Sequence, residues 1–395
     1  MARKILSILL ILGLIFSFLT ACANNGETGD LYPHREVVVP TTIAIGQASS
    51  FAIQPDGSLW AWGQNNYGEL GDGTTIDRLE PIQVMDDIVA VSAGFYHTMA
   101  IRADGSLWAW GGNMRGRLGD GTTTDRLEPI RIMDNVLAIS TGANHTMAIR
   151  TDGSLWAWGI NSRGQLGDGT TTDRLEPIQV MDGVLSVSVG IEHTMAIRAD
   201  GSLWAWGWND YGILGDGTTI DRLEPVRIMD DVLVVSTGWT HTVAIRSDGS
   251  LWAWGWNDFG GIGDGTTTDR MEPIQVIEGF VRVSDQISIM NGVLATSAGN
   301  GHTMAVKADG SLWAWGSNVT HGHLGDGTTT SRTAPVPIMD DVLTVLAGDR
   351  QTMAIRMDGS LWTWGWNEFG QLGDGTTIGQ LEPIQIMDSV MLPSN

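Results

Sequence analysis

The chain has 395 residues, of which 42% are hydrophobic and 17% are charged, so it is apolar enough to fold around a core. Its 22 basic and 45 acidic residues give a formal charge of -23, and so negative a surface repels the phosphates of nucleic acids. The 52 glycines follow no Gly-X-Y period, which excludes collagen, and a single cysteine excludes a disulfide within the chain.

The N-terminal segment is predicted to export the chain. Two basic residues precede an apolar run over residues 5–18, which suits a secretory signal and is short for a membrane span of about 20 residues. The run ends in Leu-Thr-Ala-Cys at residues 19–22, which resembles the lipobox of bacterial lipoproteins. We therefore expect residues 1–21 to be a lipoprotein signal peptide and Cys22 to carry the lipid. An ordinary signal peptide or an uncleaved anchor is the alternative.

A polar, glycine-containing segment over residues 22–36 follows, and we interpret it as a flexible tether. Removal of residues 1–21 takes away two basic residues and no acidic one, so the charge of the mature chain becomes -25. We expect the protein to be exported and lipid-anchored to the cell membrane or the outer membrane of a bacterium.

The rest of the chain is a repeat. The string Trp-Ala-Trp-Gly begins at residues 60, 108, 156, 204 and 252, at intervals of 48, then at 313, and as Trp-Thr-Trp-Gly at 362. Repeats of about 40 to 50 residues with four short strands are typical of propeller blades. The longest interval, from 252 to 313, indicates an insertion at about residues 278–290.

Each repeat predicts four strands. In the second copy, runs rich in β-branched or aromatic residues cover 89–93, 98–102, 106–111 and 129–133 and are bounded by turn-forming residues. The Asp-Gly pair between the second and third runs favours a tight hairpin. No segment between these breaks is long enough for a helical period. The predicted fold is therefore all-β, a seven-bladed β-propeller of four-stranded antiparallel blades over residues 37–395.

Ring closure is predicted to bring the strand near residues 41–45 beside the last strand, near residues 383–387, with residues 37–39 as a candidate further strand there.

The paired tryptophans are predicted to pack between blades. Trp108 and Trp110 are two residues apart, so in a strand both point to one face while Ala109 points to the other. A large face can then interlock with the small face of the next blade. The tryptophans with this structural role are Trp60, Trp62, Trp108, Trp110, Trp156, Trp158, Trp204, Trp206, Trp252, Trp254, Trp313, Trp315, Trp362 and Trp364.

The full pattern Gly-x-x-His-Thr-x-Ala-Ile, then Asp-Gly-x-Leu-Trp-x-Trp-Gly-x-Asn-x-x-Gly-x-Leu-Gly-x-Gly, resembles the repeat of the regulator of chromosome condensation family. The resemblance covers about residues 41–390 and implies a seven-bladed β-propeller. The first copy departs from it with Ser49-Ser50 in place of His-Thr, and the last has Gln351-Thr352. Guanine-nucleotide exchange on a small GTPase is the activity that the family's namesake implies, although a lipobox would keep this chain away from cytoplasmic GTPases.

Five histidines recur at one position per repeat: His97, His145, His193, His241 and His302. A ring of imidazoles suggests a metal site, but equivalent atoms of neighbouring blades are too far apart to share one ion at about 2 Å. We favour hydrogen bonds to strand ends instead. No metal and no cofactor is predicted.

The loop Gly-Asp-Gly-Thr-Thr-Thr-Asp, at residues 119–125, places two carboxylates five residues apart, which raises the alternative of a calcium site. It lacks the spacing of an EF-hand loop. We favour a turn capped by its own side chains, with Asp125 beside Arg126.

Three positions differ among the otherwise uniform copies: the pair before the His-Thr motif, the residue after Trp-Gly, and the residue before the next loop glycine. The pairs run Phe95-Tyr96, Ala143-Asn144, Ile191-Glu192, Trp239-Thr240, Asn300-Gly301 and Asp349-Arg350. In an up-and-down blade all three positions share one face, and tyrosine, tryptophan and arginine are the types that anchor interfaces. The predicted binding face comprises Tyr67, Phe95, Tyr96, Trp208, Tyr211, Trp239, Trp256, Phe259, Trp366 and Phe369.

The sequence therefore predicts a non-enzymatic, membrane-tethered, extracytoplasmic module that binds a protein or a glycan through this face. We expect a monomer that is held to the membrane by its N-terminal lipid and binds no nucleic acid. Two alternatives stay open: an exchange factor like the family's namesake, and a glycan-active propeller enzyme, for which no cluster of catalytic side chains is visible.

Overall fold

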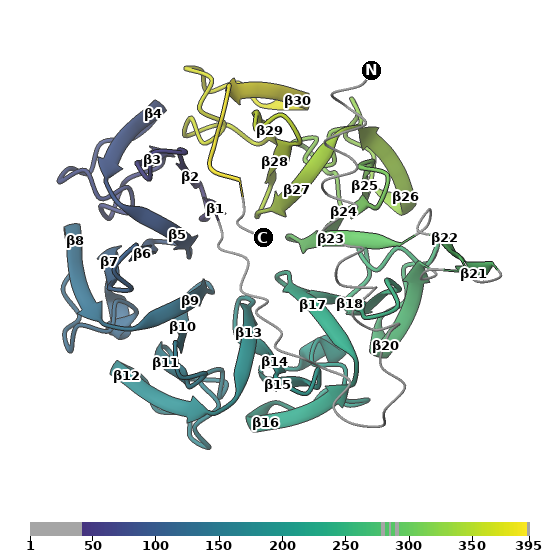
Figure 1. Cartoon of the computed structure of the whole chain (residues 1–395), viewed down its shortest axis with the longest axis horizontal. Coiled ribbons are helices and arrows are strands. Elements are labelled where there is room, and N and C mark those ends of the chain that lie inside the picture. The colour runs from purple at the N-terminus through teal and green to yellow at the C-terminus, as the bar shows by residue number, and fades with distance from the viewer. Residues whose placement is uncertain (1–41, 278–280, 284–285, 289–291, 393–395) are drawn as a thin grey trace. The chain divides into compact units, whose positions relative to one another are not determined.

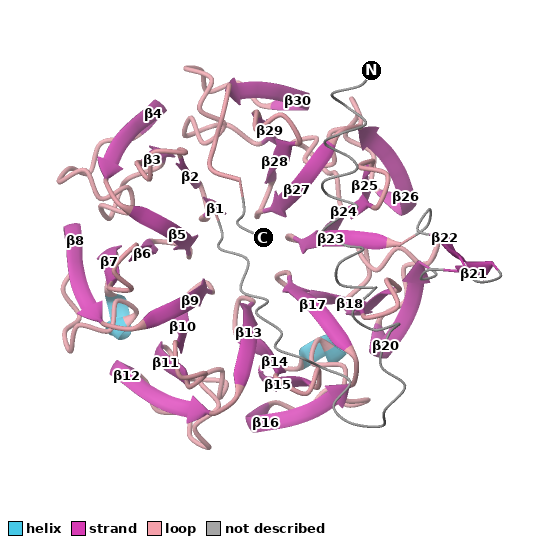
Figure 2. Ribbon diagram, viewed as in Figure 1, coloured by secondary structure: helices cyan, strands magenta, loops and turns pink. Residues whose placement is uncertain are grey.

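The computed structural model describes residues 42–277, 281–283, 286–288 and 292–392. Cys22, the predicted signal peptide, the tether and the candidate strand at 37–39 lie outside these residues. Residues 38–395 form one compact unit, in which seven four-stranded antiparallel sheets, blades 1 to 7, surround a central channel (Figure 1). The predicted seven-bladed β-propeller is confirmed, and almost all regular structure is strand (Figure 2).

The strand bounds repeat from blade to blade. Blade 1 contains β1 (Ile43–Ile45), β2 (Ser49–Ile53), β3 (Leu59–Gly63) and β4 (Arg78–Met85); blade 2, β5 (Ile88–Ala93), β6 (His97–Arg102), β7 (Leu107–Gly111) and β8 (Arg126–Met133); blade 3, β9 (Val136–Thr141), β10 (His145–Arg150), β11 (Leu155–Gly159) and β12 (Arg174–Met181); blade 4, β13 (Val184–Val189), β14 (His193–Arg198), β15 (Leu203–Gly207) and β16 (Arg222–Met229).

The remaining elements have these bounds. Blade 5 contains β17 (Val232–Thr237), β18 (His241–Arg246), β19 (Leu251–Gly255) and β20 (Arg270–Ile277); blade 6, β23 (Val293–Ala298), β24 (His302–Lys307), β25 (Leu312–Gly316) and β26 (Arg332–Met339); blade 7, β27 (Val342–Ala347), β28 (Gln351–Arg356), β29 (Leu361–Gly365) and β30 (Gln380–Met387). The insertion between blades 5 and 6 contains the antiparallel pair β21 (Val281–Val283) and β22 (Gln286–Ser288). Two short 3-10 helices are η1 (Met114–Gly116) and η2 (Asp210–Gly212).

Within a blade, each strand pairs with its sequence neighbour, from the innermost first strand to the outermost fourth (Figure 1). The first three strands of blade 2 lie within one residue of their expected bounds, but β8 begins at Arg126, three residues before the expected start at Pro129. A proline is tolerated there because β8 is an edge strand whose outer side needs no hydrogen bonds. In the described part of the chain, no helix is long and apolar enough to cross a membrane.

The blades interlock through the second tryptophan of each pair. Trp110 is fully buried in a cluster with residues of blade 1, including Ala61, and Ala109 packs in the next cluster with Trp158 of blade 3. The indole N–H of Trp110 also donates to the main-chain oxygen of Glu69 in blade 1, at 2.9 Å. The core is therefore a series of seams between blades, each with a large face against a small one.

The expected closure of the ring by pairing of the first and last strands is wrong. Among the described strands, β1 pairs with β2 alone and β30 with β29 alone, so every blade is continuous in sequence. No strand has to cross between the termini because β1 already supplies the innermost strand of blade 1. Blades 1 and 7 instead meet in a seam like the others, in which the indole of Trp62 donates to the main-chain oxygen of Gln371 at 2.9 Å.

Candidate functional site at the loop end of the propeller

The connections of each blade emerge at two opposite ends of the propeller. The first-to-second and third-to-fourth connections share one end, which we term the loop end, because alternate connections of an antiparallel meander lie on the same side. In blade 2 this is visible in the register, which sets His97 at the start of β6 opposite Gly111 at the end of β7. The Asp-Gly turns and the links between blades occupy the other end, the turn end.

A repeated network of side chains holds the long connection at the loop end. In blade 2, Asn113 accepts the N–H of Leu118 at 3.0 Å and donates to Asp120 at 2.9 Å. The second oxygen of Asp120 accepts two bonds from Arg126, at 3.0 and 2.6 Å. The expected pairing of Arg126 with its neighbour Asp125 is therefore wrong, because Asp125 instead accepts the N–H of Asn113 at 2.7 Å.

The same network recurs around the ring. The asparagine that donates to the loop aspartate is Asn65, Asn113, Asn161, Asn209, Asn257, Asn318 or Asn367. In blade 7, Gln380 replaces the arginine and donates to Asp374 at 3.3 Å. Because these residues fix the main chain of the loop, the exposed positions between them are free to vary without loss of the fold.

The histidines link neighbouring blades at the loop end. His97 of blade 2 bonds to the hydroxyl of Thr146 in blade 3, at 3.1 Å. That hydroxyl donates to the main-chain oxygen of Arg117 at 3.2 Å, and the indole of Trp158 donates to the same oxygen at 3.0 Å. At the seam between blades 7 and 1, where the sequence departs from His-Thr, Gln351 donates to Ser50 at 3.1 Å and preserves the link.

Burial keeps these imidazoles neutral. Desolvation lowers the pKa of His145 and His193 to about 3 and that of His241 to about 4, and it holds the pKa values of His97 and His302 well below their usual range. Four of the five rings hydrogen-bond through one nitrogen to a threonine hydroxyl, whereas neither nitrogen of His193 has a hydrogen-bond partner among the described residues. Among the described residues, no group of three or more His, Cys, Asp or Glu side chains is placed to hold a metal ion.

All ten aromatic residues of the predicted binding face lie in connections of the loop end, where they form three clusters with ring centroids 5.0 to 6.3 Å apart. The central cluster is Tyr67, Tyr96, Phe95 and Trp239; the blade 4–5 cluster is Trp208, Tyr211, Trp256 and Phe259; the blade 7 cluster is Trp366 and Phe369. Tyr67, Tyr211 and Phe259 are 45%, 46% and 39% exposed, and the others are half-buried.

Two members of the central cluster bridge the ring. Phe95 belongs to blade 2 and Trp239 to blade 5, yet their ring centroids are 5.1 Å apart, and both residues line the cavity in the central channel. The sequence grouped them with the outer aromatic residues because it gives no distance across the ring. The structure sets them beside the channel instead.

A buried belt of residues beneath the loops was missed by the sequence. Its members directly follow the constant loop glycine and include Glu69 and Arg117. Their main-chain oxygens accept hydrogen bonds from tryptophan indoles of the next blade. The Glu69 carboxylate accepts the N–H of Tyr67 at 2.6 Å, and burial raises its pKa to about 7. The copies differ at this position too, so extending the comparison by two residues along each repeat would have found the belt.

A polar group at blades 6 and 7 was among the variable pairs but was not selected. Asn300 donates to Asp349 at 2.7 Å, and Asp349 is only 7% exposed, so burial raises the pKa of its carboxyl group. The guanidinium of Arg350 lies 5.8 Å from the ring centroid of Trp366, which also contacts His321. The sequence signal for this polar group was the charged pair Asp349-Arg350 at the position where blades 2 and 5 have aromatic residues.

Two comparisons with solved structures agree with this architecture. Human WBSCR16 is 21% identical, with a TM-score of 0.73, over 84% of this chain and 94% of that chain. Prp20p from Saccharomyces cerevisiae is also 21% identical, with a TM-score of 0.73, over 85% of this chain and 87% of that chain. At such identities the likeness shows the fold.

Sequence comparisons identify the family. The Arabidopsis thaliana ultraviolet-B receptor UVR8 is 35% identical over 83 residues, which span 19% of this chain and 19% of that relative. The match therefore covers about a fifth of the curated relative's length. The RCC1-like domain model matches residues 25–294, and models of the regulator of chromosome condensation (RCC1) repeat match residues 293–322, 309–355 and 358–391. The chain therefore belongs to the regulator of chromosome condensation (RCC1) repeat family.

Proposed function

We propose that this protein is a non-enzymatic binding module, tethered to a membrane outside the cytoplasm, that recognises a protein or a glycan through the aromatic clusters of its loop end. The observation that carries the proposal is the gathering of ten variable aromatic residues on one end of a scaffold that is otherwise nearly identical in every blade. Rigid scaffolds that present variable loops are where binding functions usually reside.

The chemistry of the clusters supports recognition. Tyr211 and Phe259 are large apolar groups at the tips of connections whose main chain is fixed by the asparagine networks, so little conformational entropy is lost when they meet a partner. Acidic residues, Asp210 and Asp258, directly precede both rings. A partner that combines apolar and basic groups would complement this part of the surface.

A protein partner has additional support. The yeast relative Prp20p is described as having binding properties to Gsp1p and histones. The fold shared with that protein is therefore one that can serve protein recognition.

The proposal is tested by capture from intact neighbouring cells or their matrix, followed by incubation with a glycan panel. We expect the wild-type propeller to retain a partner and the variant Trp208→Ala/Tyr211→Ala/Trp256→Ala/Phe259→Ala to lose it. The variant should still unfold cooperatively, at a lower temperature than the wild type because Trp208 and Trp256 are half-buried and Trp208 packs against the core. Leu137, exposed in blade 3 and outside the clusters, offers the matched control Leu137→Ala. Product formation from a glycan would support an enzyme instead, and equal capture by the fourfold variant would refute the proposed surface.

The tether is tested separately. Cys22→Ser removes the only thiol that can be lipidated, so we expect the variant to appear in the soluble exported fraction. Cell fractionation of wild type and variant measures this. Persistence of the variant in the membrane fraction would contradict lipidation at this residue.

A further inference from the structure

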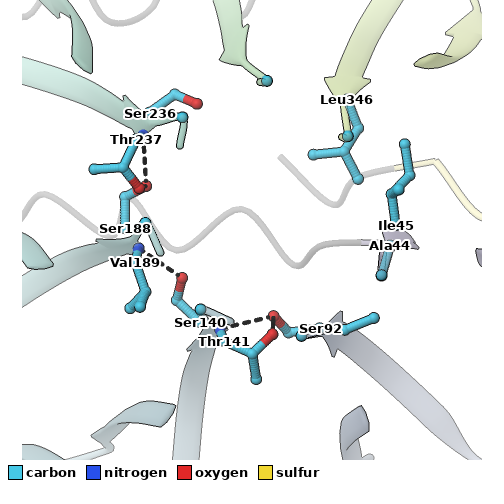
Figure 3. Close-up of a pocket in the computed structure, with 18 of the residues that line it drawn as sticks. Ala44, Ile45, Ser92, Ser140, Thr141, Ser188, Val189, Ser236, Thr237 and Leu346 are labelled. Carbon is cyan, nitrogen blue, oxygen red and sulfur yellow. Dashed lines mark hydrogen bonds between the residues drawn. The ribbon is translucent and has the colours of Figure 1, made fainter. Parts of the chain in front are cut away.

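The central channel contains a cavity of about 300 Å³, at the small end of the range for ligand pockets. It is lined by the innermost strands of all seven blades and by the connections that follow them at the loop end (Figure 3). Its wall has two unlike sectors, and the residues that make them occupy one equivalent position per blade.

Blades 2 to 6 supply hydroxyl groups. Each of five serines accepts an N–H from the next blade at 2.9 to 3.1 Å, and these serines are Ser92, Ser140, Ser188, Ser236 and Ser297. Ser140, Ser236 and Ser297 donate no hydrogen bond to any described residue, so their O–H groups remain available. This sector is polar and has unused hydrogen-bonding capacity.

Blades 7 and 1 supply an apolar sector. Leu346 and Ala44 stand where the other blades have serine, and Ile45 lies beside them (Figure 3). No hydroxyl bridge therefore crosses the seam from Leu346 to Ile45 or the seam from Ala44 to Ala93. An elongated ligand with one apolar side could lie against this sector.

The cavity has a single charge. Among the described residues that line it, Asp349 is the only charged one. Asn300 holds one oxygen of its carboxylate at 2.7 Å, and the other oxygen has no hydrogen-bond partner in the described part of the chain. Asp349 is only 7% exposed and already forms a long ion pair with Arg350, yet its second oxygen is not sealed off and remains accessible to water or to a ligand in the cavity.

Two aromatic rings add a further preference for a cation. Phe95 and Trp239 line the cavity from opposite blades, and the faces of such rings attract ammonium groups. Arg350 is the nearest cation, but its Nε lies 3.9 Å from the oxygen that Asn300 already holds, and half of its side chain faces solvent.

We propose that this cavity binds a primary amine on an aliphatic chain, with the ammonium group on Asp349 and the chain against Leu346, Ala44 and Ile45. The amine could be a free alkylamine or the side chain of a lysine, and both have the same chemistry. This site goes beyond the proposed recognition by the aromatic clusters of the loop end: it shares Phe95 and Trp239 with the central cluster but uses no residue of the blade 4–5 cluster.

Calorimetric titration of the full chain with pentylamine tests the proposal, with pentanol as the neutral probe of equal length. We expect pentylamine to bind saturably and pentanol to bind at least about tenfold more weakly, because only the amine forms a charge-assisted bond. A lysine peptide and the same peptide with an acetylated lysine distinguish a side chain from a free amine. Binding of the peptide only through its unmodified lysine identifies the side chain as the ligand.

The variants decide which residue is responsible. Asp349→Asn should weaken pentylamine binding by about tenfold or more, while Asp388→Asn, at an exposed aspartate of the turn end, should leave it unchanged. Trp239→Leu provides a second variant should Asp349→Asn unfold, and it should also weaken binding. Equal binding of amine and alcohol, unchanged binding to Asp349→Asn, or no saturable binding of any amine would overturn the proposal. The fourfold variant of the blade 4–5 cluster should still bind pentylamine, which separates this site from the proposed function.

Discussion

The two ends of the propeller are held by different means. At the turn end, one arrangement occurs in every blade: Asp104 accepts the N–H and hydroxyl of Ser106 at 2.9 and 2.6 Å, and Ser106 accepts the indole N–H of Trp108 at 2.9 Å. The exposed residues are themselves the residues that close the turn. At the loop end, the fixing residues are buried beneath the surface, and the exposed residues above them vary from blade to blade.

This difference explains why the aromatic variation gathers at the loop end. An Asp-Gly turn is so short that each of its side chains is needed for its geometry. The loop connection is longer, and Asn113 and Asp120 satisfy its main chain from below. Positions such as Arg115 can therefore change identity at little cost to folding, which is the condition that a recognition surface requires.

Two tryptophans of one strand give the largest expected contrast between the ends. Trp110 is fully buried and bonds to the neighbouring blade near the loop end, whereas Trp108 is half-buried over the turn end. We expect Trp110→Ala to lower the free energy of unfolding by about 3–5 kcal/mol and Trp108→Ala by roughly half as much. Urea denaturation measures both, and equal losses would show that the seams do not depend on the inner tryptophan.

Acid should weaken the two ends in sequence. At the loop end, the folded state keeps His145 and His193 neutral down to a pKa of about 3, while in the unfolded chain they protonate near pH 6.5. Below pH 6.5 the unfolded state therefore binds more protons than the folded state. The free energy of unfolding falls as the pH drops from 6.5 toward the pKa that the histidines have in the folded protein. Each histidine contributes up to about 1.4 kcal/mol per pH unit over this window.

The turn end responds at lower pH. Hydrogen bonds from Ser106 lower the pKa of Asp104 from 3.8, so its stabilisation persists above that value and disappears only as the pH falls through the lower folded pKa. Stability measured from pH 7 to 4 should thus fall through the histidines, with a partial offset from Glu69, whose raised pKa of about 7 lets the folded state bind a proton in this window. The variant His145→Gln, which copies the glutamine that blade 7 uses, should flatten this dependence. An unchanged slope in that variant would contradict the assignment.

Much of the fold followed from the sequence because one repeat contains all the information for a blade. The spacing of Trp108 and Trp110 predicted that both side chains point to the same face of the strand, and the Asp-Gly pair predicted the hairpin turn. The closure was mispredicted because the repeat pattern does not reveal which strand begins a blade. Because blade 1 begins with β1 and blade 7 ends with β30, neither blade takes a strand from the other end of the chain.

The site was less predictable because it depends on distances across the ring. Variation among the copies located the aromatic loops, but it could not bring Phe95 to Trp239, which are 144 residues apart in sequence. The proposed role of Asp349 was also hidden, since it depends on Asp349 being the only charged residue among the described residues that line the cavity. The partner of Arg126 was misassigned because proximity in sequence favoured Asp125.

Hydrogen exchange of the propeller with and without its captured partner tests the difference between the ends most directly. The account predicts that partner binding slows the exchange of amides in the connections at residues 208–214 and 256–262 and leaves the Asp-Gly turns unchanged. Protection confined to the turns, or spread equally over both ends, would contradict the assignment of recognition to the loop end.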